Sequence, residues 1–195
     1  PMQIGVPDIA GDVRHFELFQ QALEDSAPVP IIYEPLRDSL DGFFRHSASE
    51  HSIHINNTKS EVQMTAAIVH EMAHAHLHDR KAPGNETPDQ REARRNREEV
   101  EAESISFVVC QHFGIETDVN SFGYVANWST GKELSELKAS LETIKKTASL
   151  MIDTIDARFA ELKKEHGIED ELADVVPVEE MPDTAVVFAN DYYAY

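Results

Sequence analysis

The chain is poor in cysteine, in basic residues and in long apolar runs. Its 195 residues include one cysteine, Cys110, and 17 Lys and Arg against 36 Asp and Glu. A single cysteine excludes an internal disulfide and is typical of a reducing, cytoplasmic location. No apolar run approaches the roughly 20 residues that a membrane-spanning helix needs, so we expect no membrane contact.

The shortage of basic residues leaves a formal net charge of -19. Such a surface repels phosphate groups, so we expect no direct nucleic-acid binding by this chain, and a protein substrate or partner would present a basic patch. No Lys or Arg follows Lys164, while nine carboxylates lie between Glu165 and Asp191. We therefore expect one domain over residues 1–167 and an acidic, aromatic-ended tail over 168–195, either extended or docked elsewhere.

The most informative segment is an H-E-x-x-H pattern over residues 70–74. A capping-box sequence over residues 60–63 predicts that a helix begins just before it. Residues four apart share a helix face, so His70 and His74 can offer two imidazole nitrogens to one metal ion. Glu71 is placed to accept a proton from water at that metal. A helix with two surface histidines is the alternative that so short a pattern leaves open.

A second predicted helix supplies a third metal ligand. A capping-box sequence over residues 87–90 predicts its start, and Gly114 predicts that it ends near His112. Glu99 and Glu103 lie four apart on this helix, so both can face the first helix. Glu99 could bind the metal, and Glu103 could accept a hydrogen bond from a ligand histidine. A glutamate-rich helix can also be a solvated face, and this alternative stays open.

The two motifs together carry a resemblance to a known family. H-E-x-x-H followed about 25 residues later by E-x-x-A-E, at residues 99–103, resembles the gluzincin pattern and, more narrowly, the ImmA/IrrE metallopeptidase superfamily. Residues 97–115 are similar to the zincin domain of ArdC-type antirestriction proteins and LtrC-like proteins of conjugative elements. Residues 124–128 are similar to the short aromatic segment that follows there. The likeness covers roughly residues 60–155.

The resemblance implies a zinc-dependent metallopeptidase that hydrolyses peptide bonds in a protein substrate, in a regulatory role linked to a mobile element. It implies Zn2+ held by His70, His74 and Glu99, with Glu71 as the general base. Tyr124 is a candidate donor to the oxyanion, and Tyr33 is another. The alternative is a catalytically silent zincin-like module that holds a partner protein in antirestriction or conjugal transfer.

The remaining pattern predicts an α+β fold that is mainly helical. We expect a first helix over residues 12–24, then short strands at 31–33, 42–45 and 52–55 that form a small three-stranded sheet before the H-E-x-x-H helix. In zincins an edge strand of this sheet binds the substrate backbone. A long C-terminal helix over 133–165 carries an apolar residue every three or four positions. That stripe indicates either core packing or, like the acidic tail, a surface for a homodimer or partner.

Several other residues have a less specialised interpretation. His78 lies eight residues after His70, or about 12 Å along a helix, so both cannot bind one ion directly. We expect His78 at the surface or in contact with a ligand. Three further histidines are expected to be ordinary polar positions, although one could line the site: His46, His51 and His54. Cys110 lies in an apolar helical stretch, which favours packing over nucleophilic chemistry.

Overall fold

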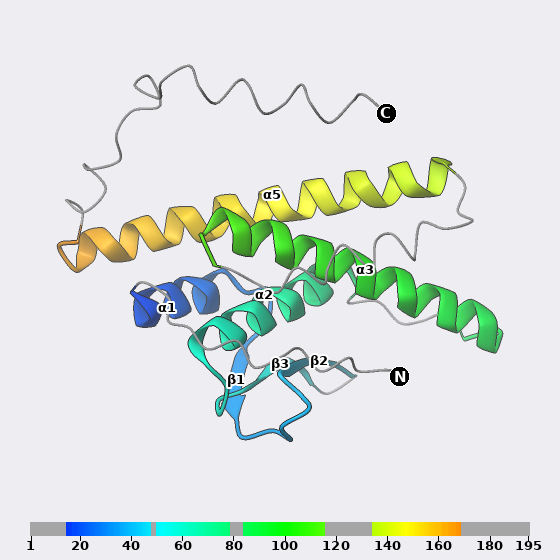
Figure 1. Cartoon of the computed structure of the whole chain (residues 1–195), viewed down its shortest axis with the longest axis horizontal. Helices are drawn as coiled ribbons and strands as arrows, with labels where there is room; N and C mark the ends of the chain where they lie inside the picture. Colours follow the sequence, from blue (N-terminus) through cyan, green and yellow to red (C-terminus); the bar gives the residue numbers. More distant parts are fainter. Residues whose placement is uncertain (1–14, 48–49, 79–83, 116–133, 169–195) are drawn as a thin grey trace, which may run out of the picture. The chain divides into compact units, whose positions relative to one another are not determined.

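The structure is a computed structural model that describes residues 15–47, 50–78, 84–115 and 134–168. Its elements, in chain order, are α1 (Phe16–Ser26), β1 (Ile31–Glu34), β2 (Gly42–His46), β3 (His51–Asn56), α2 (Glu61–Leu77), α3 (Pro88–His112) and α5 (Leu134–Glu165) (Figure 1). This order confirms the predicted α+β class, with a small sheet before the motif-bearing helix and a long helix near the C-terminus.

Helix α1 packs one apolar face onto the core. Phe19, Ala22 and Leu23 are buried there, at 2% exposure or less. The helix ends at Ser26, two residues later than predicted, because the first backbone-breaking residue is Pro28. The predicted start at residue 12 lies outside the described residues.

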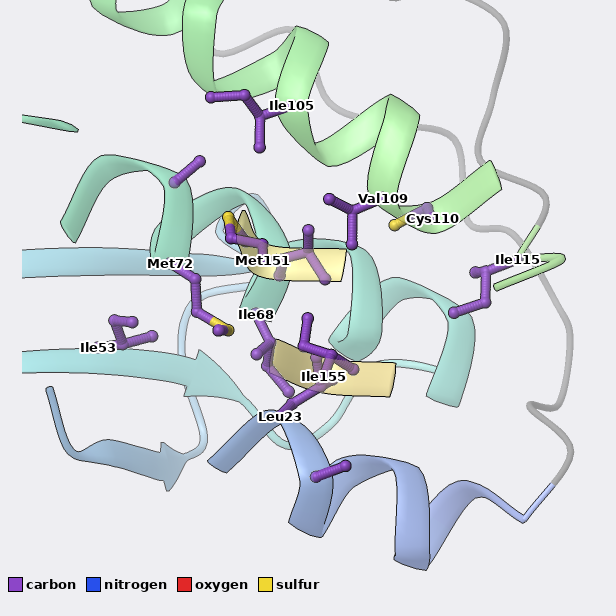
Figure 2. Packing of buried hydrophobic residues seen from close by; sticks show 14 of the residues in the cluster. Leu23, Ile53, Ile68, Met72, Ile105, Val109, Cys110, Ile115, Met151 and Ile155 are labelled. Atoms are coloured by element: carbon purple, nitrogen blue, oxygen red, sulfur yellow. The ribbon is translucent and has the colours of Figure 1, made fainter. Parts of the chain in front are cut away.

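Strand β3 is the centre of the sheet, whose order is β1-β3-β2. It pairs parallel to β1 and antiparallel to β2, so β1 and β2 are the edges within the described part of the chain. Ile53 and Ile55 belong to the same buried cluster as Met72 of α2, and Figure 2 shows Ile53 beside Met72. Residues 52–56 of this strand are all buried, so both of its faces are covered. On the second face, His54 forms polar contacts with Glu34 and Ser52.

Helix α2 lies between the sheet and α3 (Figure 1). Its capping box is present as predicted: the Ser60 hydroxyl accepts from the Gln63 N–H at 3.3 Å, and the Gln63 side chain accepts from the Ser60 N–H at 3.4 Å. Ile68 and Met72 are fully buried. The helix ends at Leu77, and His78 follows as its C-terminal cap.

Helix α3 begins and ends where the sequence predicts. Thr87 and Gln90 form its capping box, and Gly114 follows its last turn with φ of 67°, a conformation that favours glycine. Ala102 is fully buried and belongs to the core cluster that also contains residues of α2. Cys110 is buried too, and burial raises the pKa of its thiol to about 12. Its surroundings therefore favour packing, as the sequence indicated.

Helix α5 buries most of its apolar stripe. Met151 and Ile155 are buried in the core (Figure 2), and the Phe159 ring lies 5.1 Å from that of Phe19. Leu141, in the same stripe, is 60% exposed. The core-packing interpretation therefore holds for much of this helix, and a partner surface on it stays a prediction.

The chain divides into two units, Pro1–Leu162 and Lys163–Tyr195. In the second, the described residues are the last turn of α5 and a turn at Gly167, whose φ is 69°. Among the helices that the structure describes, none has the length and apolar character needed to cross a membrane.

Candidate metal centre

Three side chains from two helices converge in the described structure. His70 and His74 lie one turn apart on α2, and Glu99 reaches them from α3. The Nε2 atoms of the two histidines are 3.1 Å apart, and one Glu99 carboxylate oxygen lies 3.7 Å from each. The fold thus brings together the three residues that the sequence analysis names as metal ligands.

The triangle of donor atoms has the dimensions of a zinc site. Bonds of about 2.0–2.2 Å in a tetrahedron place neighbouring donor atoms about 3.3 Å apart. The observed separations of 3.1 and 3.7 Å lie on either side of that value. Two imidazoles and one carboxylate leave a fourth position open, as catalytic zinc sites do. The Glu99 side chain is 61% exposed, so the site can be reached from solvent.

Each imidazole is also held through its second nitrogen. His70 Nδ1 lies 3.2 Å from a Glu103 carboxylate oxygen, and His74 Nδ1 lies 2.9 Å from His78 Nδ1. A carboxylate can only accept, so His70 donates its Nδ1–H to Glu103 and keeps Nε2 available for a metal. Glu103 therefore lies where it can orient His70, the position that the sequence predicts for it.

Burial and nearby carboxylates act in opposite directions on His70. Burial by itself would lower the pKa of this imidazole, but hydrogen bonds with Glu103 and Glu99, together with the charge of Glu71, raise it to about 10. Hydrogen bonds from His70 and His74 hold the pKa of Glu99 well below its ordinary value. Three carboxylates, those of Glu71, Glu99 and Glu103, therefore act on His70, and such surroundings favour a positive charge, whether on the imidazole or on a bound cation.

Glu71 lies against the sheet. It is 9% exposed, and a methyl group added at Gly42 of β2 would lie 3.4 Å from its Cγ atom. The missing side chain at Gly42 thus leaves room for this carboxylate. Glu71 is thus next to the ligand His70 in the sequence of α2, and its side chain packs near Gly42 of the edge strand β2.

Two residues near the centre were not identified from the sequence. Glu101 lies 3.3 Å from His78 Nε2, and its other carboxylate oxygen lies 2.8 Å from the Ser140 hydroxyl of α5. Burial would raise the pKa of Glu101, but the hydrogen bonds from His78 and Ser140 lower it below its ordinary value. The only available signal was that His78 shares a helix face with His70 and His74. Nothing local pointed to Ser140, 39 residues after Glu101.

His54 is a buried histidine in a different polar cluster. Its Nδ1 lies 2.6 Å from a Glu34 oxygen and its Nε2 lies 2.9 Å from the Ser52 hydroxyl, while its ring stacks on Phe43 at 4.6 Å. The order Glu34, His54, Ser52 is that of a hydrolase triad. Ser52 is only 3% exposed, however, so its hydroxyl is not open to a substrate. The cluster instead joins β1 to β3 and covers the second face of the sheet.

Of the two tyrosines predicted as candidate oxyanion donors, the structure describes Tyr33 only. Tyr33 lies beside Glu24 and Gln20 of α1, and burial, reinforced by Glu24, raises the pKa of its phenol. It is part of the packing between α1 and the sheet. Tyr124 lies outside the described residues, so its role remains a prediction.

Comparison with known proteins points to the same region of the chain. A family model described as zincin-like metallopeptidase matches residues 44–150, more than half of the chain. An uncharacterized protein of Bacillus anthracis is 35% identical over 112 residues, which are 57% of this chain and 18% of that relative. The chain thus spans less than a fifth of that relative's length. No solved structure matches. The family match contains α2 and α3 in full, and with them the whole donor triangle.

Proposed function

Because the chain belongs to the zincin-like metallopeptidase family, we propose that it is a zinc-dependent peptidase with its metal on His70, His74 and Glu99. The observation that carries the proposal is the triangle of two imidazole nitrogens and one carboxylate oxygen, with sides of 3.1, 3.7 and 3.7 Å. This donor set is one that zinc prefers in hydrolytic enzymes.

Each side chain around the donor triangle has a separate role in peptide hydrolysis. When bound, zinc supplies a Lewis acid that polarises the scissile carbonyl and makes water more acidic. Glu71 accepts the proton of the attacking water and delivers it to the leaving amine. Glu103 orients His70 through the Nδ1 contact at 3.2 Å. Tyr124 is the proposed donor to the oxyanion.

We infer that the substrate is a protein segment bound in an extended form. Strand β2 is an edge of the sheet within the described residues, and its Gly42 lies against Glu71. A peptide added to that edge would lie next to the proposed base. The net charge of -19 favours a substrate with basic residues near the cleaved bond. By its resemblance to the ImmA/IrrE and ArdC-type proteins, we assign the peptidase a regulatory role linked to a mobile element, in the cytoplasm.

The test is a comparison of wild-type protein with Glu71→Gln. Both are loaded with zinc and incubated with a peptide library that includes Lys- and Arg-rich members, and cleavage is followed by mass spectrometry. We expect Glu71→Gln to retain zinc by elemental analysis and to lose at least about 100-fold in kcat/KM, because it lacks the general base. His70→Ala should lose zinc and activity together.

Glu61→Gln is the matched control, because it is the same substitution in the first turn of the same helix. It should cleave like wild type. Full activity in Glu71→Gln would contradict the assigned base. Zinc binding at His70 without cleavage of any peptide or candidate regulatory protein would instead favour the silent module that holds a partner protein.

A further inference from the structure

A chain of hydrogen bonds leads from His74 across α3 to α5. His74 Nδ1 lies 2.9 Å from His78 Nδ1, and His78 Nε2 lies 3.3 Å from one Glu101 oxygen. The other Glu101 oxygen lies 2.8 Å from Ser140 Oγ. The His78 and Glu101 side chains are 11% and 10% exposed, and Ser140 is 5% exposed. Little water can therefore replace these contacts.

Only one arrangement of protons satisfies every member when His74 binds a metal. Its Nε2 faces the donor triangle and must be bare, so the proton of His74 is on Nδ1. That N–H donates to His78 Nδ1, which leaves the His78 proton on Nε2. The His78 Nε2–H then donates to Glu101, whose second oxygen accepts from the Ser140 hydroxyl. Every contact has one donor and one acceptor.

We propose that His78 and Glu101 are positioning residues that hold the His74 ring in its metal-binding orientation. The inference rests on the proposed function, since it assumes a metal at His70, His74 and Glu99. A carboxylate behind a ligand histidine selects its tautomer and makes it a stronger ligand, and loss of such a partner typically weakens metal binding 10- to 100-fold. Here the carboxylate acts through a second imidazole.

A structural role is the competing explanation. The same contacts join α2, α3 and α5, so they would stabilise the fold even if no metal were bound. The two roles differ in what they change. A positioning role alters metal affinity and the ligand field of the bound ion, whereas a structural role alters the unfolding temperature of the metal-free protein.

The experiment uses the full chain with His78→Phe and His78→Gln. Zinc affinity is measured by competition with a chromogenic chelator, and the ligand field is read from the visible absorption bands of bound Co2+. We expect His78→Phe to weaken zinc binding about 10- to 100-fold and to shift the cobalt bands. His78→Gln should recover part of the affinity, because its amide oxygen can accept from His74 Nδ1.

His76→Phe is the matched control, since it places the same substitution at an exposed position two residues earlier, in the last turn of α2. It should bind zinc like wild type. Glu101→Gln provides a second route if His78→Phe fails to fold. It should weaken zinc binding, and the double variant should bind no more weakly than His78→Phe alone, because both changes interrupt one chain.

The outcomes separate this inference from the proposed function. If His70→Ala binds zinc as tightly as wild type, the metal site itself is wrong and both proposals fall. If His70→Ala loses zinc but His78→Phe matches His76→Phe in affinity and cobalt spectrum, the positioning role is overturned and the metal site stands. A lower unfolding temperature of metal-free His78→Phe with unchanged affinity would likewise overturn it.

Discussion

At the scale of single residues, neighbouring glutamates of α3 have different partners. Glu98 forms two contacts with Arg94, at 2.8 and 2.9 Å, while the next residue, Glu99, faces His70 and His74. Each residue turns about 100° around a helix, so adjacent carboxylates must point in different directions. The chemical role of a glutamate in this run therefore depends on which neighbour its face meets.

Gly42 is important because it has no side chain. A methyl group there would lie 2.9 Å from both the His54 carbonyl oxygen and Ile55 Cδ1, and 3.4 Å from Glu71 Cγ. We predict that Gly42→Ala lowers the free energy of unfolding by about 1–3 kcal/mol, because the backbone oxygen cannot move away freely. It should also lower kcat/KM, because a shift of β2 that relieves the two 2.9 Å contacts would change the packing of this strand near Glu71. Chemical denaturation and the peptide assay measure the two effects.

Gly84→Ala is the control for this prediction, because among the described residues no atom beyond its chain neighbours lies within 4 Å of the added methyl group. It should leave both the unfolding free energy and kcat/KM close to wild type. Equal unfolding free energies of the Gly42 and Gly84 variants would show that β2 can shift without cost. The argument that a methyl group at Gly42 clashes with β3 would then be wrong.

At the scale of elements, the two halves of α3 are stabilised by different interactions. From residue 100 onward, Val100, Ala102, Ile105 and Val109 are buried. The first half, residues 88–99, has no buried member, so tertiary packing contributes little there. The start of the helix therefore depends on its cap, and this half carries Glu99 into the metal centre.

Thr87→Ala tests that dependence. The Thr87 hydroxyl accepts from the Gln90 N–H at 3.2 Å, and its loss leaves that donor unpaired. We predict a loss of about 1 kcal/mol in the free energy of unfolding. Faster amide hydrogen exchange in the first turns of α3 should accompany it. Thr154→Ala, on the exposed face of α5, should cause neither change, since alanine is the better helix former. Unchanged exchange at the start of α3 in Thr87→Ala would contradict the cap's role.

At the scale of the whole molecule, the candidate metal centre brings together side chains of α2 and α3, and these contacts are all noncovalent. The chain has no disulfide, because Cys110 is its only cysteine. The carboxylates beside His70 lie in a chain whose formal net charge is already -19, so they repel other negative charges. A divalent cation would both neutralise local charge and join α2 to α3, so metal binding should stabilise the folded protein.

We predict that zinc raises the unfolding temperature of the wild-type chain and that a chelator reverses the change. At free zinc 100-fold above its Kd, binding to the folded state alone contributes about 2.7 kcal/mol. His70→Ala should show little of this shift, because it lacks one of the three donors. Differential scanning calorimetry at matched zinc concentrations measures it. An equal shift in His70→Ala would place the stabilising metal elsewhere.

Much of this protein is determined by short-range patterns in its sequence. The caps at Ser60 and Thr87, the stop at Gly114 and the spacing of His70 and His74 depend on residues three or four apart, and helix geometry converts that spacing directly into proximity. The three strands were likewise predictable from short apolar and alternating segments. The choice of Glu99 and Glu103 also followed from spacing, once the first motif was known.

Tertiary structure alone decided the contacts that join distant parts of the chain. The order β1-β3-β2, the burial of His54 between Glu34 and Ser52, and the bond from Glu101 to Ser140 depend on partners 20 or more residues away, or on the packing of whole elements. The same is true of the contact between Glu71 and Gly42. Periodicity states which face of an element is apolar, but the neighbour that covers it is set by the packing of the complete chain.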